Sequence, residues 1–212
     1  MTTLDRVLLL ATGLAAIYIL WGLASSYRQT TPKPHPALYS IVAFAVLLVA
    51  GLLLIAFGYG ALQSPLVVIV AVLIPAGLSL GLVAQFLPRF EKAYLTFAAL
   101  GLIAIAITRF TGPSWLATVV LVLVHSVAGV LILSIPIWAV AGKKAPSGFL
   151  GVSLGGALID LGGVALAFLK AGSQLLFLSE TVVFTILAPL LLLMTLAFAW
   201  GFASKAKSGA GR

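Results

Sequence analysis

The chain has 212 residues, of which 63% are hydrophobic and only 8% are charged. Soluble domains carry about 25% charged residues, so this composition excludes an ordinary soluble domain and indicates a polytopic membrane protein that folds as one domain over residues 1–212. The formal net charge of +8 comes from basic residues between the hydrophobic runs, which is typical of topology signals rather than of a nucleic-acid-binding surface.

Two residue types are missing from the sequence, and their absence excludes several kinds of site. There is no cysteine, which excludes disulfides, thiol redox chemistry and thiolate metal sites. Asparagine is also missing, which excludes N-glycosylation sequons. The scarcity of thermolabile residue types is typical of a thermophilic prokaryote, although a GC-rich genome or the hydrophobicity itself is an alternative cause. The first apolar run, residues 7–24, has no convincing cleavage site and is expected to be the first spanning helix.

Successive apolar runs of about 20 residues predict the spanning helices, because an α-helix rises about 1.5 Å per residue. The first loop contains three alternating prolines and is expected to be extended and stiff. The link between the second and third helices, residues 63–65, predicts a tight antiparallel hairpin. The predicted fold is all-α with seven transmembrane helices at about 4–25, 37–62, 65–88, 93–109, 113–141, 149–170 and 178–203.

The distribution of lysine and arginine predicts the orientation of these helices. With seven spans, nine basic residues share one face and three share the other, whereas without the short span at 93–109 the division would be six to six. The positive-inside rule therefore favours seven spans, with the N-terminus outside and the C-terminus in the cytoplasm of a plasma-membrane protein. The face with nine carries Arg28, Lys33, Arg89, Lys92, Lys143, Lys144, Lys205, Lys207 and Arg212, and the other carries Arg6, Arg109 and Lys170.

Two short similarities raise the hypothesis of an inverted repeat, which many transporters contain. The pentad 77–81 resembles the pentad 151–155, and Val-Ala-Gly occurs at 49–51 and again at 127–129. The spacing between the members of the two pairs differs, and a composition rich in glycine, leucine and serine produces such matches by chance. Both interpretations stay open.

Asp160 is the acidic residue expected near the middle of a span, within the glycine-rich helix at 149–170. A carboxylate at that depth costs about 2.5 kcal/mol or more, so it is expected to face protein or water. Its helical stripe is small and polar and includes Ser153 and Gly163, which leaves room for water, a substrate or a closely packed helix. The carboxylate is either a proton carrier or a hydrogen-bonded link between helices.

His125 is expected at a similar depth on the preceding helix, where it and Asp160 would form a proton relay or an ion site. The alternative is a neutral histidine that hydrogen-bonds a backbone carbonyl freed by Pro136. Met194 is predicted at a depth comparable to that of His125, and a His/Met pair can hold haem b, although a buried methionine is more often core filling. His35, in the proline loop, is expected to be an interfacial residue.

Other polar residues would line a pathway or simply make interhelical hydrogen bonds. Pro75, Pro136 and Pro189 each fall inside a predicted span, where kinked helices form membrane sites. Glycine pairs at 77/81 and 151/155 are expected to mark close helix contacts within the chain rather than a dimer interface. The further candidates for a pathway are Ser79, Gln85, Thr185 and Ser153.

These observations favour a small transporter or channel, proton-coupled through Asp160 and His125. The alternative is a membrane-anchor subunit of a respiratory or other redox complex, associated with haem or quinone or purely structural. An enzyme acting on lipids is weaker, because the acidic pairs that hold a metal-bound pyrophosphate are missing. No lysine lies within the last helix to hold retinal, and there is no HExxH, GxSxG or P-loop motif. The expected partners are the bilayer and either further copies of the chain or other membrane subunits. No metal site is expected, and the cofactor is either absent or, in the alternative with His125 and Met194, haem b.

Overall fold

The computed structural model describes residues 1–31, 35–170, 172 and 179–210. Within these residues all regular structure is helical, and seven helical segments are long and apolar enough to cross a membrane. The prediction of an all-α bundle with seven helices long and apolar enough to span a membrane is therefore confirmed. The segments are α1 (Thr3–Gln29), α2 (His35–Phe57), α3 (Pro65–Ala71) continued by α4 (Leu73–Phe86), α5 (Glu91–Thr111), α6 (Ser114–Ala141), α7 (Leu150–Lys170) and α8 (Glu180–Ala210).

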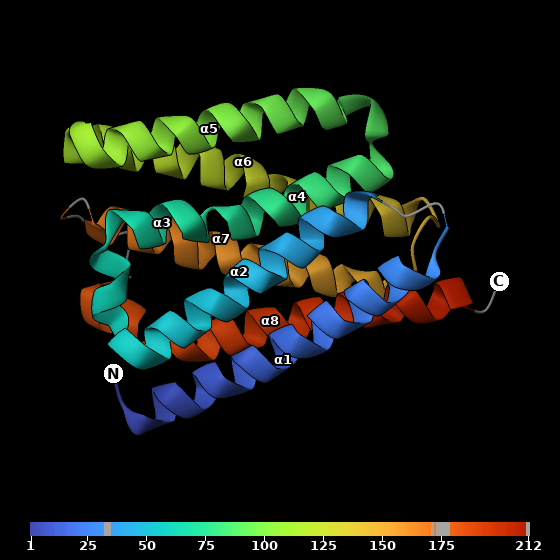
Figure 1. Cartoon of the computed structure of the whole chain (residues 1–212), viewed down its shortest axis with the longest axis horizontal. Helices are drawn as coiled ribbons and strands as arrows, with labels where there is room; N and C mark the ends of the chain where they lie inside the picture. Colours follow the sequence, from blue (N-terminus) through green and yellow to red (C-terminus); the bar gives the residue numbers. More distant parts are fainter. Residues whose placement is uncertain (32–34, 171, 173–178, 211–212) are drawn as a thin grey trace.

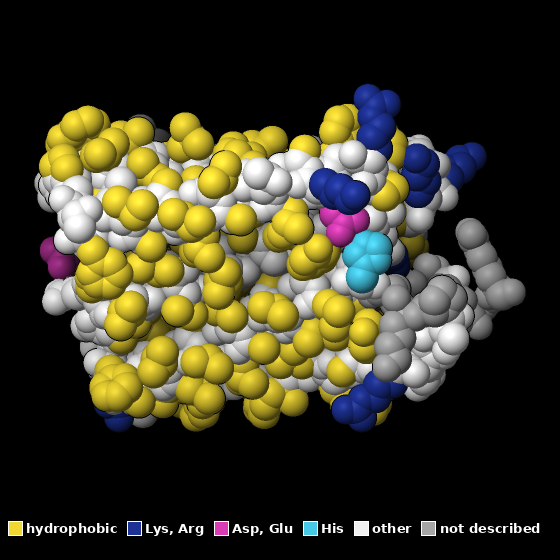
Figure 2. All heavy atoms as spheres, turned by 45° about the horizontal axis from the view of Figure 1, so that its top comes forward, with side chains coloured by type: hydrophobic (Ala, Val, Ile, Leu, Met, Phe, Trp, Pro, Cys, Tyr) yellow, Lys and Arg dark blue, Asp and Glu magenta, His cyan; other side chains and the backbone are white. Residues whose placement is uncertain are grey.

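The helices lie side by side along the long axis of the molecule, and the chain termini are at opposite ends (Figure 1). In this view α5 lies along one edge of the bundle and α1 along the other, while α7 packs against both α6 and α8. Hydrophobic side chains cover the face shown in Figure 2, and most of its lysine and arginine side chains lie at one end. An apolar lateral surface with charges at the ends is what contact with a bilayer requires.

Two of the predicted helices end or break earlier than the sequence indicates. The helix predicted at 37–62 ends at Phe57, because Gly58 takes a positive φ of 67° and the chain continues as the 3₁₀ segment η1 (Tyr59–Gln63). The helix predicted at 65–88 is interrupted at Val72 and ends at Phe86. The interruption lies one turn before Pro75, which has no N–H to donate to the carbonyl of Ala71.

The remaining prolines do not break their helices. Pro136 lies inside a continuous α6, and Pro189 lies inside a continuous α8. The helix predicted at 178–203 begins at Glu180 and extends to Ala210, while residue 178 lies outside the described residues. Lys33 and Arg212 of the predicted charge distribution also lie outside them, as do the side chains of Lys170 and Lys207.

The expected glycine contacts join helices of the same chain. A Cβ atom at Gly77 on α4 would lie 2.8 Å from the Tyr39 carbonyl oxygen and 3.0 Å from Ala43 Cβ, both on α2. At Gly151 on α7, a Cβ atom would lie 2.6 Å from the carbonyl oxygen of Ala197 on α8. These distances are shorter than van der Waals contact, so the two helix pairs approach closely only because the side chains are hydrogen atoms.

We predict that Gly77→Ala lowers stability by about 1–3 kcal/mol, because the added methyl group overlaps a backbone atom of α2 that moves only with the helix. Gly51→Ala on α2 is the matched control, since Gly51 is buried in a helix but a methyl group added there would meet no other atom within 4 Å. This variant should be unchanged or gain up to about 1 kcal/mol. Thermal unfolding in detergent measures both, and equal effects would contradict the account.

Candidate functional site

The structure brings together the two ionisable residues expected near the middle of the bundle. His125 Nε2 on α6 lies 3.8 Å from Asp160 Oδ1 on α7 and 3.3 Å from the carbonyl oxygen of Ile159. A carbonyl oxygen can only accept, so Nε2 carries a hydrogen in this arrangement. The imidazole is well buried, with 9% of its side chain exposed, whereas 30% of the Asp160 side chain is exposed.

Two glycines make room for this pair, each on the helix opposite the side chain it faces. A Cβ atom at Gly163 on α7 would collide with the ring of His125, and a Cβ atom at Gly129 on α6 would collide with the carboxyl group of Asp160. Gly129 lies one helical turn beyond His125, and Gly163 lies about one turn beyond Asp160, as an antiparallel pair of helices requires. Each polar side chain therefore occupies space that only glycine on the partner helix leaves open.

The carboxyl group of Asp160 is not fully satisfied. Its Oδ1 atom is buried and has no hydrogen-bond partner among the described residues. A small rotation of the His125 ring would move the Nε2–H from the Ile159 carbonyl to this oxygen, since the two acceptors lie 3.3 Å and 3.8 Å from the same nitrogen. The pair can thus pass a proton between an imidazole and a carboxylate, as general acids and bases do once their hydrogen bonds tighten.

A cavity of about 520 Å³ leads to His125 from the end of the bundle that carries η1. It lies between α3, α5, α6, α7 and α8, and its lining is mainly aliphatic. His125 and Gly163 line it, but Asp160 does not. His125 is therefore in contact with the cavity on one side and with Asp160 on the other.

Charged and aromatic side chains line the same cavity nearer the end of the bundle. Arg109, in the last turn of α5, has two buried nitrogen atoms, Nε and Nη2, that have no hydrogen-bond partner among the described residues. Glu180 is in the first turn of α8, where a helix N-terminus favours an acid. Tyr59 of η1 stacks on Phe184, with ring centroids 5.4 Å apart.

The other predicted pathway residues lie elsewhere. The hydroxyl of Ser153 donates to the carbonyl of Leu133 at 2.7 Å, which links α7 to α6 near Pro136. Ser79 is fully buried, and its hydroxyl lies 2.8 Å from the Tyr94 hydroxyl. Thr185 donates to the carbonyl of Thr181 within its own helix, and Gln85 is exposed. None of these four residues lines the cavity beside His125.

Met194, the predicted second haem ligand, is fully buried in the main hydrophobic cluster. Phe44 and Phe198 belong to the same cluster, and the cavity beside His125 is not lined by Met194. The described residues also contain no group of three or more His, Cys, Asp or Glu side chains that could hold a metal ion.

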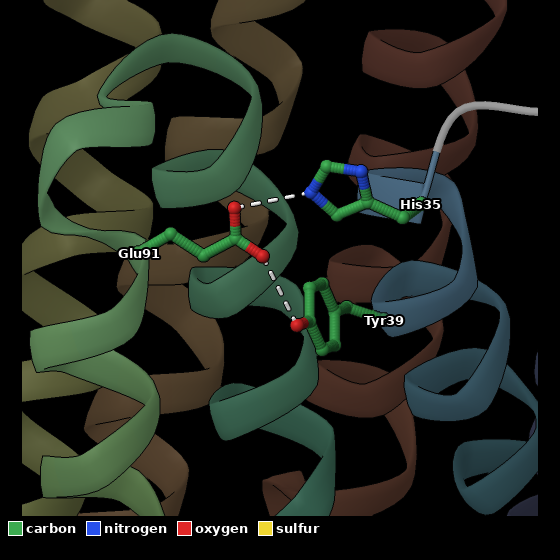
Figure 3. Close-up of polar contacts among 3 residues, drawn as sticks. All are labelled: His35, Tyr39 and Glu91. Atoms are coloured by element: carbon green, nitrogen blue, oxygen red, sulfur yellow. Dashed lines mark hydrogen bonds and ion pairs between the residues drawn. The ribbon is translucent and has the colours of Figure 1, made fainter.

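A polar cluster at the other end of the bundle was not anticipated from the sequence (Figure 3). His35 Nε2 lies 3.0 Å from Glu91 Oε2, and the Tyr39 hydroxyl donates to Glu91 Oε1 at 3.2 Å. His35 and Tyr39 are one turn apart on α2, whereas Glu91 begins α5. Only the spacing of His35 and Tyr39 was visible in the sequence, because their partner is more than 50 positions away.

The chain matches no protein-family model, no curated protein and no solved structure. Any functional conclusion therefore depends on the geometry described above.

Tyr59 gives a test of the cavity rim in solution. Burial, followed by the negative charge of Asp5, raises the pKa of Tyr59 from 10.0 to about 12. The folded state thus keeps this proton at a pH where the unfolded chain loses it, so the contribution is complete below pH 10.0 and falls as the pH rises toward 12. We predict that the wild type loses stability relative to Tyr59→Phe when the pH is raised from about 9.5 to about 11.5. Thermal unfolding of both proteins at each pH measures this difference. A constant difference would contradict burial of the hydroxyl.

Proposed function

We propose that the protein is a small membrane transporter or channel in which Asp160 takes up and releases a proton and His125 relays it. The single observation that carries the proposal is the position of His125, which lines the cavity and lies 3.8 Å from Asp160 Oδ1. Ionisable residues at this depth are costly and are retained mainly where they serve a pathway. Here the cost is increased because Oδ1 of Asp160 is buried and has no hydrogen-bond partner within the described ranges.

The proposed path begins in the cavity at the η1 end and continues through the imidazole to the carboxylate. A proton that reaches His125 on the cavity side can leave toward Asp160, because the ring contacts both. Glycine at positions 129 and 163 supports the proposal, since any larger residue would separate the two groups.

The proposed orientation places the η1 end outside the cell and the opposite end in the cytoplasm of a prokaryotic plasma membrane. It is supported by the basic side chains, since Arg28, Arg89, Lys92, Lys143, Lys144 and Lys205 lie at one end and Arg6 and Arg109 at the other. Basic residues concentrate on the cytoplasmic side of membrane proteins. With this orientation the cavity opens outward.

We predict that Asp160→Asn lowers proton entry into proteoliposomes to the rate of empty liposomes without loss of folding. Asparagine has nearly the same shape as aspartate but exchanges no proton at the pH of the assay. Entry is followed with an internal pH-sensitive dye under an inward pH gradient and a potassium diffusion potential. Glu91→Gln, at the other end of the bundle, is the matched control and should carry protons like the wild type.

A chemical measurement accompanies the flux assay. A hydrophobic carbodiimide modifies protonated carboxyl groups in apolar surroundings, so mass spectrometry should find the label on Asp160, with a rate that depends on pH and changes in His125→Gln. Equal proton entry in the wild type and Asp160→Asn would overturn the proposed function. A labelling rate unaffected by His125→Gln would remove the relay from it.

The orientation can be tested by cysteine labelling, because the chain has no native cysteine that would react as well. Ser114 begins α6 at the η1 end, and Ser208 lies in the last turn of α8 at the other, both exposed. A membrane-impermeant maleimide should label Ser114→Cys in intact cells and Ser208→Cys only after permeabilisation. The reverse pattern would show the opposite orientation.

A further inference from the structure

The guanidinium group of Arg109 is the feature of the cavity that the proton path does not use. It belongs to the last turn of α5, where a positive charge interacts favourably with the helix dipole. That interaction explains why a positive side chain occurs at this position, but it does not explain why two of its buried nitrogen atoms lack a hydrogen-bond partner among the described residues. If Arg109 served only the end of its helix, Nε and Nη2 would donate to the free carbonyl groups there, and neither atom has a partner among the described residues.

The identity of the unpaired atoms indicates what they bind. Nε–H and one N–H of Nη2 point in parallel along one edge of the guanidinium plane. This edge binds the two oxygens of a carboxylate or phosphate at the same time. Among the described residues, the acidic side chains that form ion pairs within 4.0 Å are Glu91 and Asp160, each with a histidine, so no protein carboxylate occupies this edge of Arg109.

The rest of the cavity is suited to an apolar body. Its volume of about 520 Å³ lies within the range of pockets that hold drug-sized ligands. Aliphatic side chains such as Val68, Leu121 and Leu166 line it together with Arg109 and His125. Glu180 also lines the cavity, but its exposed carboxylate is placed at the N-terminus of α8, where the helix itself stabilises the charge. Among the charged side chains that line the cavity, Arg109 is thus the one with buried nitrogens that have no hydrogen-bond partner in the described part of the chain.

We propose that this cavity binds an amphiphilic oxyanion, with its carboxylate or phosphate on the Nε/Nη2 edge of Arg109 and its apolar body against the aliphatic lining toward His125. If the protein is the transporter proposed above, this anion is the class of molecule that it carries, and that part of the inference rests on the proposed function. Binding itself needs no transport. The same chemistry has two sources, a free single-chain acid and the headgroup of an anionic phospholipid.

The binding experiment uses the whole protein in nanodiscs of zwitterionic phosphatidylcholine, with radiolabelled octanoate as the probe. Octanoate should bind saturably, and octanamide, a neutral molecule of the same length, should compete at least about tenfold more weakly, since a charge-assisted bidentate contact is lost. Arg109→Gln should weaken octanoate binding by about tenfold or more, and Arg109→Lys should fall between, because lysine keeps the charge without the fork.

Two further variants separate the binding site from general effects. Arg6→Gln removes an exposed arginine at the same end and should leave octanoate binding unchanged. Ala71→Phe fills the cavity while keeping Arg109, and should abolish binding. Arg109→Gln should fold normally, because the two nitrogens that it removes make no hydrogen bond in the described structure. Thermal unfolding in detergent checks this.

The remaining arm identifies the source of the anion. If phosphatidylglycerol in the nanodisc displaces octanoate from the wild type, the ligand is a lipid headgroup. If phosphatidylglycerol does not compete, the ligand is a free acid. Equal binding of octanoate and octanamide, or full binding in Arg109→Gln, would overturn the proposal. Asp160→Asn should retain octanoate binding, so loss of proton entry with retained binding tests the proposed function separately from the anion site.

Discussion

The close contact between α6 and α7 determines the geometry of the candidate site, because two glycines on this contact leave the space that two polar side chains fill. His125 lies against Gly163 and Asp160 lies against Gly129, so each helix provides both a functional side chain and room for its partner. Helices in a bilayer associate through packing of small residues rather than through the hydrophobic effect. The interaction that joins these helices is therefore also the one that sets the distance between imidazole and carboxylate.

The cavity reaches only one member of the His125–Asp160 pair. His125 lines the cavity, Asp160 lies behind it, and Arg109 lies at the far end of the lining. A cation near the end of the bundle, a buried imidazole deeper inside and a carboxylate beyond it therefore lie in succession. Opposite charges attract strongly where water is scarce. Under the proposed function, entry of an anion toward Arg109 and entry of a proton toward His125 would therefore favour each other.

The sequence was sufficient for the features that depend on composition and local spacing. Hydrophobic run length predicts seven spans, and the depth of residues 125 and 160 in consecutive helices predicts that their side chains lie near each other. It was not sufficient for the end of α2, which is set by the positive φ of Gly58, or for the break at Val72. The pairing of Glu91 with His35 and the unpaired edge of Arg109 depend on packing between distant segments, which no local pattern encodes. Ser79 and Thr185 were predicted from their polarity and from the prolines in the same helices, and their hydroxyl groups form hydrogen bonds within or between helices away from the cavity.

The central claim is that His125 and Asp160 act as one coupled unit, and nitrogen-15 NMR of the histidine side chains tests it most directly. The chain has two histidines, His35 and His125, so their signals can be assigned with one variant. We predict that Asp160→Asn changes the pH at which the His125 ring titrates, because the two groups lie 3.8 Å apart, and the ring signals of His35, which lies beside Glu91 at the other end of the bundle, serve as the internal reference. Identical titration of His125 in the wild type and in Asp160→Asn would contradict it.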